Sequence, residues 1–268
     1  MLGAGMSALV EKAARTLRED GYGRLVLKTL RYPLKPLLVP LASRRLQAEA
    51  AEHPGIEAWV ELTGRFNYAG ISIESWQIAS EIERFLRMLE ADPPRAVLEI
   101  GTARGGTLFL LTRAAAPDAL LVSVDLRRGQ FGGGYPRWRA RLYRTFAREG
   151  QRVELVLGDS HERRTRERIG RLLGERALDL LLVDGDHTYE GVKQDFADYS
   201  PLVRPGGLVA FHDIVPGGPG KHGDPGGVPA FWRELAATHE ASELVEDWEW
   251  GSCGIGFFRL GPSGREQR

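Results

Sequence analysis

The sequence predicts an α/β protein whose mostly parallel sheet is covered by helices on both faces. Between about residues 96 and 211, short and wholly apolar runs alternate with segments of helical pattern. Runs that are apolar throughout are typical of strands buried on both faces, as in a parallel sheet. Their alternation with helical segments at this spacing indicates strand–helix–strand units. A helical N-terminal extension and a C-terminal antiparallel hairpin complete the prediction.

The predicted elements follow one another from residue 73 onward. Apolar positions at helical spacing predict a helix over 73–89, which the Asp-Pro-Pro sequence at 92–94 ends. The predicted strands are 96–100, 120–124, 153–157, 178–183 and 208–211. The predicted helices between them are 107–116, 138–148, 163–173 and 189–199. Residues 243–248 and 254–260 are expected to form the hairpin around Gly251.

Three parts are expected along the 268 residues: a helical extension over 1–72, one main domain over 73–260, and a polar tail over 261–268. The extension contains a basic stretch without acids, consisting of Arg24, Lys28, Arg31, Lys35, Arg44 and Arg45. It is expected to pack on the core or on a second copy, or to contact an anionic membrane surface. Prolines at 33, 36 and 40 argue against one clean amphipathic helix over this basic stretch.

Composition excludes several classes of protein. Lys plus Arg and Asp plus Glu both number 36, so no net field favours nucleic acid or a membrane. The single cysteine excludes an intramolecular disulfide and a cysteine-rich metal site. Residues 1–10 lack the pattern of a secretion signal, and no run reaches the roughly 18 apolar residues of a spanning helix. We therefore expect a cytoplasmic protein.

The turn after the first predicted strand carries the first chemical signal. Glu99 precedes Gly101, and Gly105 follows four residues later. Glycines after a strand allow a sharp turn and the close approach of a ligand. A dinucleotide site would need three spaced glycines, but Ala103 takes the middle position. A carboxylate at 99 also suits a cationic ligand better than a pyrophosphate; the alternative is an ordinary helix-packing turn.

Acids also follow the next two predicted strands. Asp125 ends the second, and Asp159 with Ser160 follows the third. An acid at the first position can accept hydrogen bonds from both hydroxyls of a ribose, and one at the second can accept from an adenine amino group. Each acid alone could be an ordinary loop cap. Three successive strands that end in acids are more specific, because these strand ends share one edge of a parallel sheet.

These residues together resemble the cofactor motifs of class I S-adenosylmethionine-dependent methyltransferases. The motif is Glu99-x-Gly101-x-x-x-Gly105, followed by Asp125 and by 158–160. Residues 183–192 and 202–208 are similar to the branch that includes cephalosporin-hydroxylase-like proteins and metal-assisted small-molecule O-methyltransferases. The resemblance covers about residues 73–260. It implies a Rossmann-like fold and methyl transfer from S-adenosylmethionine to a hydroxyl of a sugar, phenol or other natural product.

The resemblance also implies a role for each motif residue. Glu99 would hold the amino end of the cofactor, Asp125 its ribose, and Asp159 with Ser160 its adenine. The full set of implied cofactor-binding residues is Glu99, Gly101, Thr102, Ala103, Gly105, Asp125, Asp159 and Ser160.

In metal-assisted relatives, acids that end the fourth and fifth strands bind a divalent cation. The matching residues here are Asp184, His212 and Asp213. Oxygen ligands suit Mg²⁺, and the cation would lower the pKa of the acceptor hydroxyl. His212 stands where an acid is usual, and a nitrogen ligand shifts the preference toward manganese, iron or zinc. Alternatively, His212 or His187 is a general base, or each makes only structural hydrogen bonds.

Other functions remain open at this point. A nicotinamide-dependent oxidoreductase could use a similar sheet, although Glu99 and Ala103 argue against it. His187, His212 and Asp213 could imitate the two-His-one-carboxylate iron site of a hydroxylase. The chain could also bind S-adenosylmethionine without catalysis. The balanced charge argues against a nucleic-acid methyltransferase.

Overall fold

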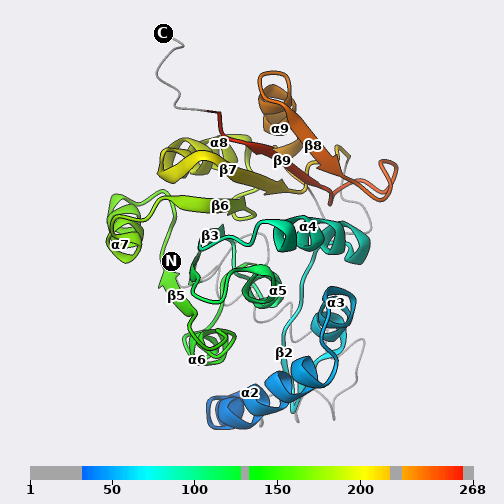
Figure 1. Ribbon diagram of the computed structural model, residues 1–268, viewed down its shortest axis with the longest axis vertical. Helices are drawn as coiled ribbons and strands as arrows, with labels where there is room; N and C mark the ends of the chain where they lie inside the picture. The colour runs from blue at the N-terminus through cyan, green and yellow to red at the C-terminus, as the bar shows by residue number, and fades with distance from the viewer. Residues whose placement is uncertain (1–31, 128–132, 218–224, 262–268) are drawn as a thin grey trace, which may run out of the picture.

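A computed structural model describes residues 32–127, 133–217 and 225–261, and it confirms the predicted α/β architecture. One seven-stranded sheet has the strand order β5-β4-β3-β6-β7-β9-β8 (Figure 1). Its first five strands are parallel, and the predicted C-terminal hairpin adds two antiparallel strands. The strands are β3 (Ala96–Ile100), β4 (Leu120–Asp125), β5 (Arg152–Leu157), β6 (Leu178–Val183), β7 (Val203–His212), β8 (Ala241–Leu244) and β9 (Ile255–Arg259).

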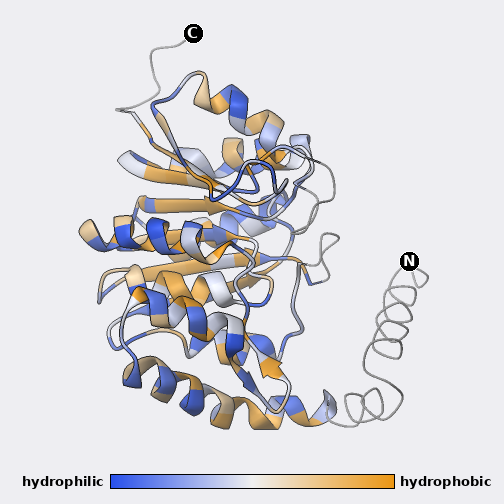
Figure 2. Cartoon of the chain, turned by 90° about the vertical axis from the view of Figure 1, so that its right-hand side faces the viewer, coloured by the Kyte–Doolittle hydropathy of each residue, from blue (hydrophilic) through white to orange (hydrophobic). Residues whose placement is uncertain are grey.

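Helices cover both faces of this sheet. One face carries α4 (Ala79–Ala91), α5 (Gly106–Ala114) and α6 (Arg139–Arg144), and the other carries α7 (Arg163–Leu173), α8 (Tyr189–Tyr199), η2 (Ser200–Leu202) and α9 (Val228–Ala236). Successive side chains of β3 alternate between the two cores, with Val97 in one and Leu98 in the other. All residues of β3 and β4 are buried, and Figure 2 shows the central strands mostly in the hydrophobic colour. Burial on both faces of the sheet explains why these strands are apolar throughout in the sequence.

The N-terminal part adds helices to one of these cores. It contains η1 (Tyr32–Leu34), α2 (Lys35–Glu52), α3 (Ile56–Arg65) and a two-stranded sheet of β1 (Asn67–Tyr68) and β2 (Ile71–Ser72). Leu46 of α2 is fully buried, and Ser43 Oγ donates to Thr145 Oγ1 at 2.7 Å just beyond α6. The described part of the extension is therefore continuous with the core of the main domain. No helix among the described residues is long and apolar enough to cross a membrane.

The prolines of the N-terminal arm do not interrupt helix α2. Helix α2 is continuous over 18 residues, with Pro36 in its first turn and Pro40 inside it. Proline in a first turn costs little, because the N–H that it lacks has no partner within the helix. Pro40 removes one helical hydrogen bond, which the burial of Leu46 and its neighbours along the helix offsets.

The prediction of a helix over 73–89 is wrong for its first six residues, which are not helical. Helix α4 begins at Ala79, and the preceding residues cross the loop that follows β3. Gly106 N donates to Glu74 O at 3.1 Å, and Thr107 Oγ1 donates to Gln77 Oε1 at 2.6 Å. These contacts satisfy polar groups that a helix would have paired locally, so tertiary contacts override the helical period.

The carboxyl ends of β3 and β6 meet closely at one edge of the sheet. Asp184 N donates to Ile100 O at 2.8 Å, directly beyond the paired residues Ile100 and Val183. A Cβ atom on Gly101 would lie 1.9 Å from Asp184 O, and Gly101 has φ +101°. Only glycine fits at this point, because any side chain would collide with the neighbouring backbone.

We expect Gly101→Ala to destabilise the protein by at least about 2 kcal/mol, from backbone strain and the collision with Asp184. The matched control is Gly170→Ala in α7, where an added Cβ would meet nothing within 4 Å. That change should stabilise the protein by about 0.5–1 kcal/mol. Urea denaturation measures both, and equal effects of the two substitutions would contradict the close contact at residue 101.

Candidate active site

The turn after β3 is held in a strained conformation by contacts from other segments. Ala103 has φ +42°, which is unfavourable for a residue with a Cβ atom. Its N–H donates to Asp125 Oδ2 at 2.7 Å, and its carbonyl accepts from Tyr143 Oη at 3.0 Å. A Cβ atom on Gly105 would lie 2.6 Å from the Tyr143 ring. The strain is therefore located at the turn that the sequence predicts to approach a cofactor.

The carboxylate of Asp125 accepts hydrogen bonds from three backbone amides. Besides Ala103, Leu126 N donates at 2.6 Å and Gly134 N lies 3.0 Å from both oxygens. Burial raises the pKa of Asp125, and these amide bonds offset only part of that effect. Asp125 thus connects two segments by hydrogen bonds: the turn after β3, through Ala103, and the backbone at Gly134. Gly134 is a contact that the sequence analysis missed.

Glu99 is a fully buried carboxylate. Its Oε2 accepts from Ser123 Oγ at 2.5 Å, and Oε1 has no hydrogen-bond partner among the described residues. Burial raises the pKa of Glu99 to about 8, and the nearby charges of Asp184 and Asp125 raise it further against the bond from Ser123. A cationic group next to Glu99 would lower this pKa again, because an opposite charge favours the ionised form of the carboxylate.

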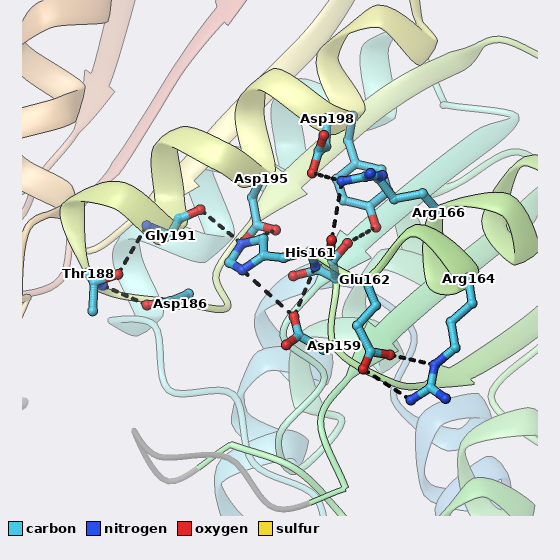
Figure 3. Close-up of polar contacts among 12 residues, drawn as sticks. Asp159, His161, Glu162, Arg164, Arg166, Asp186, Thr188, Gly191, Asp195 and Asp198 are labelled. Carbon is cyan, nitrogen blue, oxygen red and sulfur yellow. Dashed lines mark hydrogen bonds and ion pairs between the residues drawn. The ribbon is translucent and has the colours of Figure 1, made fainter.

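Asp159 lies in a network of polar side chains around His161 (Figure 3), and Ser160 lies between these two residues in the sequence. His161 N donates to Asp159 Oδ1 at 2.9 Å, and Tyr199 Oη donates to Ser160 O at 2.6 Å. The ring Nε2 of His161 lies 3.1 Å from Oδ1 of buried Asp195 in α8, and this contact raises the pKa of His161 to about 9. No pattern in the sequence indicated a role for His161, although it directly follows the Asp-Ser pair.

Four predicted residues meet at the ends of β6 and β7. His212 Nδ1 lies 3.2 Å from Asp184 Oδ1 and 3.5 Å from Asp213 Oδ2. His187 Nδ1 lies 3.4 Å from Asp213 Oδ2, and its Nε2 lies 3.8 Å from Asp184 Oδ1. One oxygen of each carboxylate therefore faces both imidazoles. We call Asp184, His187, His212 and Asp213 the His–Asp cluster.

The other oxygen of each carboxylate is held by residues that the sequence analysis missed. Gln77 Nε2 donates to Asp184 Oδ2 at 2.8 Å. Ser252 Oγ and Cys253 N donate to Asp213 Oδ1 at 2.9 and 2.8 Å. Asp213, Ser252 and Cys253 all have positive φ, which costs energy for residues other than glycine. These contacts orient both carboxylates toward the imidazoles.

The carboxylates and imidazoles of the cluster stabilise one another's charged forms. Burial would raise the pKa of Asp213, but His212, His187 and the hydrogen bond from Cys253 N together lower that pKa well below its usual range. Burial would lower the pKa of His212, but Asp213 and Asp184 raise it well above its usual range. Nε2 of His212 is buried without a hydrogen-bond partner among the described residues. Two sets of ligand atoms that each lie within 4.8 Å of one another could hold a metal ion: Asp184 with His187 and Asp213, and His212 with Asp213 and Cys253.

The central part of the chain is similar to known methyltransferases. Residues 98–214 match the family model described as a methyltransferase domain. A candidate O-methyltransferase of Mycobacterium avium is 27% identical over 164 residues, which cover 58% of this chain and 62% of that protein. An uncharacterized protein of Sinorhizobium fredii is 32% identical over 153 residues, which cover 56% of this chain and 16% of that protein. The chain thus spans less than two thirds of the length of these relatives.

Solved structures share the fold at low sequence identity. The O-methyltransferase from Bacillus cereus, in complex with S-adenosylhomocysteine, has a TM-score of 0.52 at 18% identity, covering 82% of this chain and 99% of that one. The O-methyltransferase TomG from Streptomyces achromogenes has a TM-score of 0.50 at 20% identity, covering 78% and 91%. These matches confirm the predicted Rossmann-like fold. The domain match and the Mycobacterium avium relative confirm that the chain resembles methyltransferases, and O-methyltransferases among them.

We expect His161→Gln to destabilise the protein by about 3–5 kcal/mol, because it leaves Asp195 as a buried carboxylate without its cation. Adding Asp195→Asn should restore most of this loss. The pKa of His161 lies above its unfolded value of 6.5, at about 9. Protonated His161 therefore stabilises the fold fully below pH 6.5, and that contribution is lost as the pH rises through 9.

Urea denaturation between pH 6 and 10 measures both effects of the His161–Asp195 pair. The double variant serves as the control, because it lacks the pair and should lose less stability than the wild type over this range. A wild type and a double variant with identical pH profiles would contradict the assignment of this ion pair.

Proposed function

We propose that this chain, which carries a methyltransferase domain of the class I kind, transfers the methyl group of S-adenosylmethionine to a hydroxyl oxygen of a small molecule. The observation that carries the proposal is that Glu99, Asp125 and Asp159 lie at or just beyond the carboxyl ends of three neighbouring strands, where the turn after β3 holds Ala103 at positive φ. The related mycobacterial proteins and the cofactor-bound O-methyltransferases of the same fold support it.

The residues of this edge fit S-adenosylmethionine by charge and by their capacity for hydrogen bonds. The ligand carries an ammonium and a sulfonium, and Glu99 has a buried oxygen that lacks a partner. Asp125 is placed to accept ribose hydroxyls if they share or replace the bond from Gly134. Asp159 and Ser160 are proposed for adenine, and Thr102 and Ala103 for the turn beneath the ligand. When bound, the cofactor supplies a methyl group that its positive sulfur makes reactive.

The His–Asp cluster is proposed to prepare the acceptor. Asp184, His212 and Asp213 are the proposed ligands of a divalent cation, which would hold the acceptor hydroxyl and lower its pKa. His187 is proposed as the general base, because its side chain is 16% exposed whereas that of His212 is only 5% exposed. A base must reach the proton that it takes from the acceptor, and the more exposed imidazole is better placed to do so.

The N-terminal extension is proposed as a contact surface. Large apolar side chains on η1 and α2 are exposed, namely Tyr32, Leu34, Leu37 and Leu41. They lie on the same segment as the basic residues Lys35, Arg44 and Arg45. A membrane surface or a second copy of the chain would cover this combination of apolar and basic groups. The cytoplasm remains the proposed location, and the proposed substrate partner is a small molecule rather than a nucleic acid.

We expect S-adenosylhomocysteine to bind, and Asp125→Ala to weaken that binding by about 1–3 kcal/mol, the range for lost hydrogen bonds to a charged group. Isothermal titration calorimetry measures the affinity. Asp118→Ala is the matched control, since this exposed acid precedes β4 at the opposite end of the strand. Unchanged affinity in Asp125→Ala would remove Asp125 from the binding site.

We expect His187→Gln to lower the turnover number by about 10²–10⁴-fold while the affinity for S-adenosylhomocysteine is retained, because the change removes the base but not the cofactor residues. Mass spectrometry of methylated products from a panel of hydroxylated sugars and phenols identifies the acceptor first. Exhaustive chelation should abolish the same activity, and added metal should restore it. Full turnover after chelation would remove the cation from the proposal.

A further inference from the structure

A pocket of about 170 Å³ lies at the amino ends of β3, β6 and β7, next to the end of α4. The proposed cofactor residues and the His–Asp cluster lie at the other edge of the sheet, at the carboxyl ends of its parallel strands. Asp179, which lines the pocket, is five positions before Asp184 of the cluster. A strand rises about 3.3 Å per residue, so the pocket lies roughly 16 Å from the cluster and is a separate feature of the molecule.

One part of the pocket lining is apolar. Its side chains come from the end of α4, from the segment before β3 and from β7, namely Met88, Leu89, Pro93, Pro94 and Leu208. Leu89 and Leu208 also belong to the core of the domain and are 5% and 4% exposed, which fixes their positions. A cavity of about 150 Å³ is large enough to bind benzene. The volume of the pocket therefore suits a ligand with one six-membered ring.

Two arginines line the same pocket and keep hydrogen-bond donors that no described residue uses. Arg204 donates from Nε to Asp179 Oδ1 at 2.6 Å, and Arg259 donates from Nη1 to Gly206 O at 2.9 Å, so both side chains are anchored. Nη2 of Arg204 has no hydrogen-bond acceptor in the described part of the chain, and neither do Nε and Nη2 of Arg259. These donors are available to an anion.

The carboxylate of Asp92 lies near both arginines but binds neither closely. Its Oδ2 lies 4.0 Å from Arg204 Nη2 and 3.9 Å from Arg259 Nη1, which is beyond hydrogen-bond distance. The side chain of Asp92 is 65% exposed, and an exposed ion pair of this kind contributes little. A ligand carboxylate that approaches both guanidinium groups more closely would displace Asp92, because its hydrogen bonds to them are charge-assisted.

We propose that this pocket binds a small carboxylate that carries one aromatic ring, of which benzoate is the simplest example. The carboxylate accepts hydrogen bonds from Arg204 and Arg259 in place of Asp92, and the ring packs against the apolar part of the lining. An aromatic ring fits this lining better than an aliphatic ring of the same size, because guanidinium groups also stack on aromatic faces. This site goes beyond the proposed function and does not depend on it.

Met88 allows occupancy of the pocket to be measured directly. The chain has three methionines, Met1, Met6 and Met88, of which Met88 lines the pocket. Full-length protein with ¹³C-labelled methionine methyl groups is titrated with benzoate and followed by NMR, and the Met88 signal is assigned from its loss in Met88→Leu. The ring should shift this signal in a saturable manner with a Kd of about 1 mM or below, the range for a good ligand of this size. The signals of Met1 and Met6 serve as internal controls.

Variants and analogues of benzoate test the two parts of the site separately. Arg259→Gln should weaken binding by about 10-fold, because it removes charge-assisted hydrogen bonds. Asp92→Asn should tighten binding by about 2–5-fold, because it removes the competing carboxylate. The control is Arg233→Gln, since Arg233 is exposed on α9 away from the pocket. Benzyl alcohol lacks the charge and acetate lacks the ring, so each should bind at least ~10-fold more weakly than benzoate.

The wild-type titrations alone decide the inference if a variant fails to fold. A Met88 signal that does not move would overturn it, as would an equal response to benzyl alcohol or to acetate. With folded variants, equal affinities of the wild type and Arg259→Gln would also overturn it. Competition between benzoate and S-adenosylhomocysteine would place benzoate at the opposite edge of the sheet and would overturn it as well. Failure of S-adenosylhomocysteine to bind would count only against the proposed function.

Discussion

The close approach of β3 and β6 at their carboxyl ends is the constraint on which the site depends. Gly101 has no room for a side chain because the carbonyl of Asp184 lies where a Cβ atom would be. The bond from Asp184 N to Ile100 O joins the two strands at the same point. The proposed cofactor residues lie at or just beyond the carboxyl ends of β3, β4 and β5 on one side of this junction, and the His–Asp cluster lies at or just beyond those of β6 and β7 on the other. The junction thus fixes the spacing between the two halves of the site.

The two halves differ in how their buried charge is balanced. On the cofactor side, burial and neighbouring carboxylates raise the pKa of Glu99 to about 8, and one of its oxygens lacks a partner. On the other side, the pKa of Asp184 is lowered despite burial, because His212 and His187 supply positive charge. The first half therefore favours a ligand that brings its own cation. The second half can hold its charges in place before any ligand arrives.

The sequence predicted those features that depend on local pattern. Buried parallel strands produce unbroken apolar runs, so all five were found, and the acids that follow them were placed correctly at one edge. Features that depend on distant contacts were missed. Gln77 lay within a segment of helical period, which the loop after β3 holds in a non-helical conformation. Ser252 reaches Asp213 from 39 positions away, and no local pattern indicates such a contact.

The position of Cys253 has a consequence for how opening of the site can be observed. It is the only cysteine of the chain, it is 1% exposed, and its amide binds the carboxylate of Asp213. A thiol reagent can reach it only when the segment before β9 separates from the end of β7. Its rate of modification therefore reports the free energy of that local opening. Modification of Cys253 thus measures how often the contacts that hold Asp213 open, and this measurement needs no assay of enzyme activity.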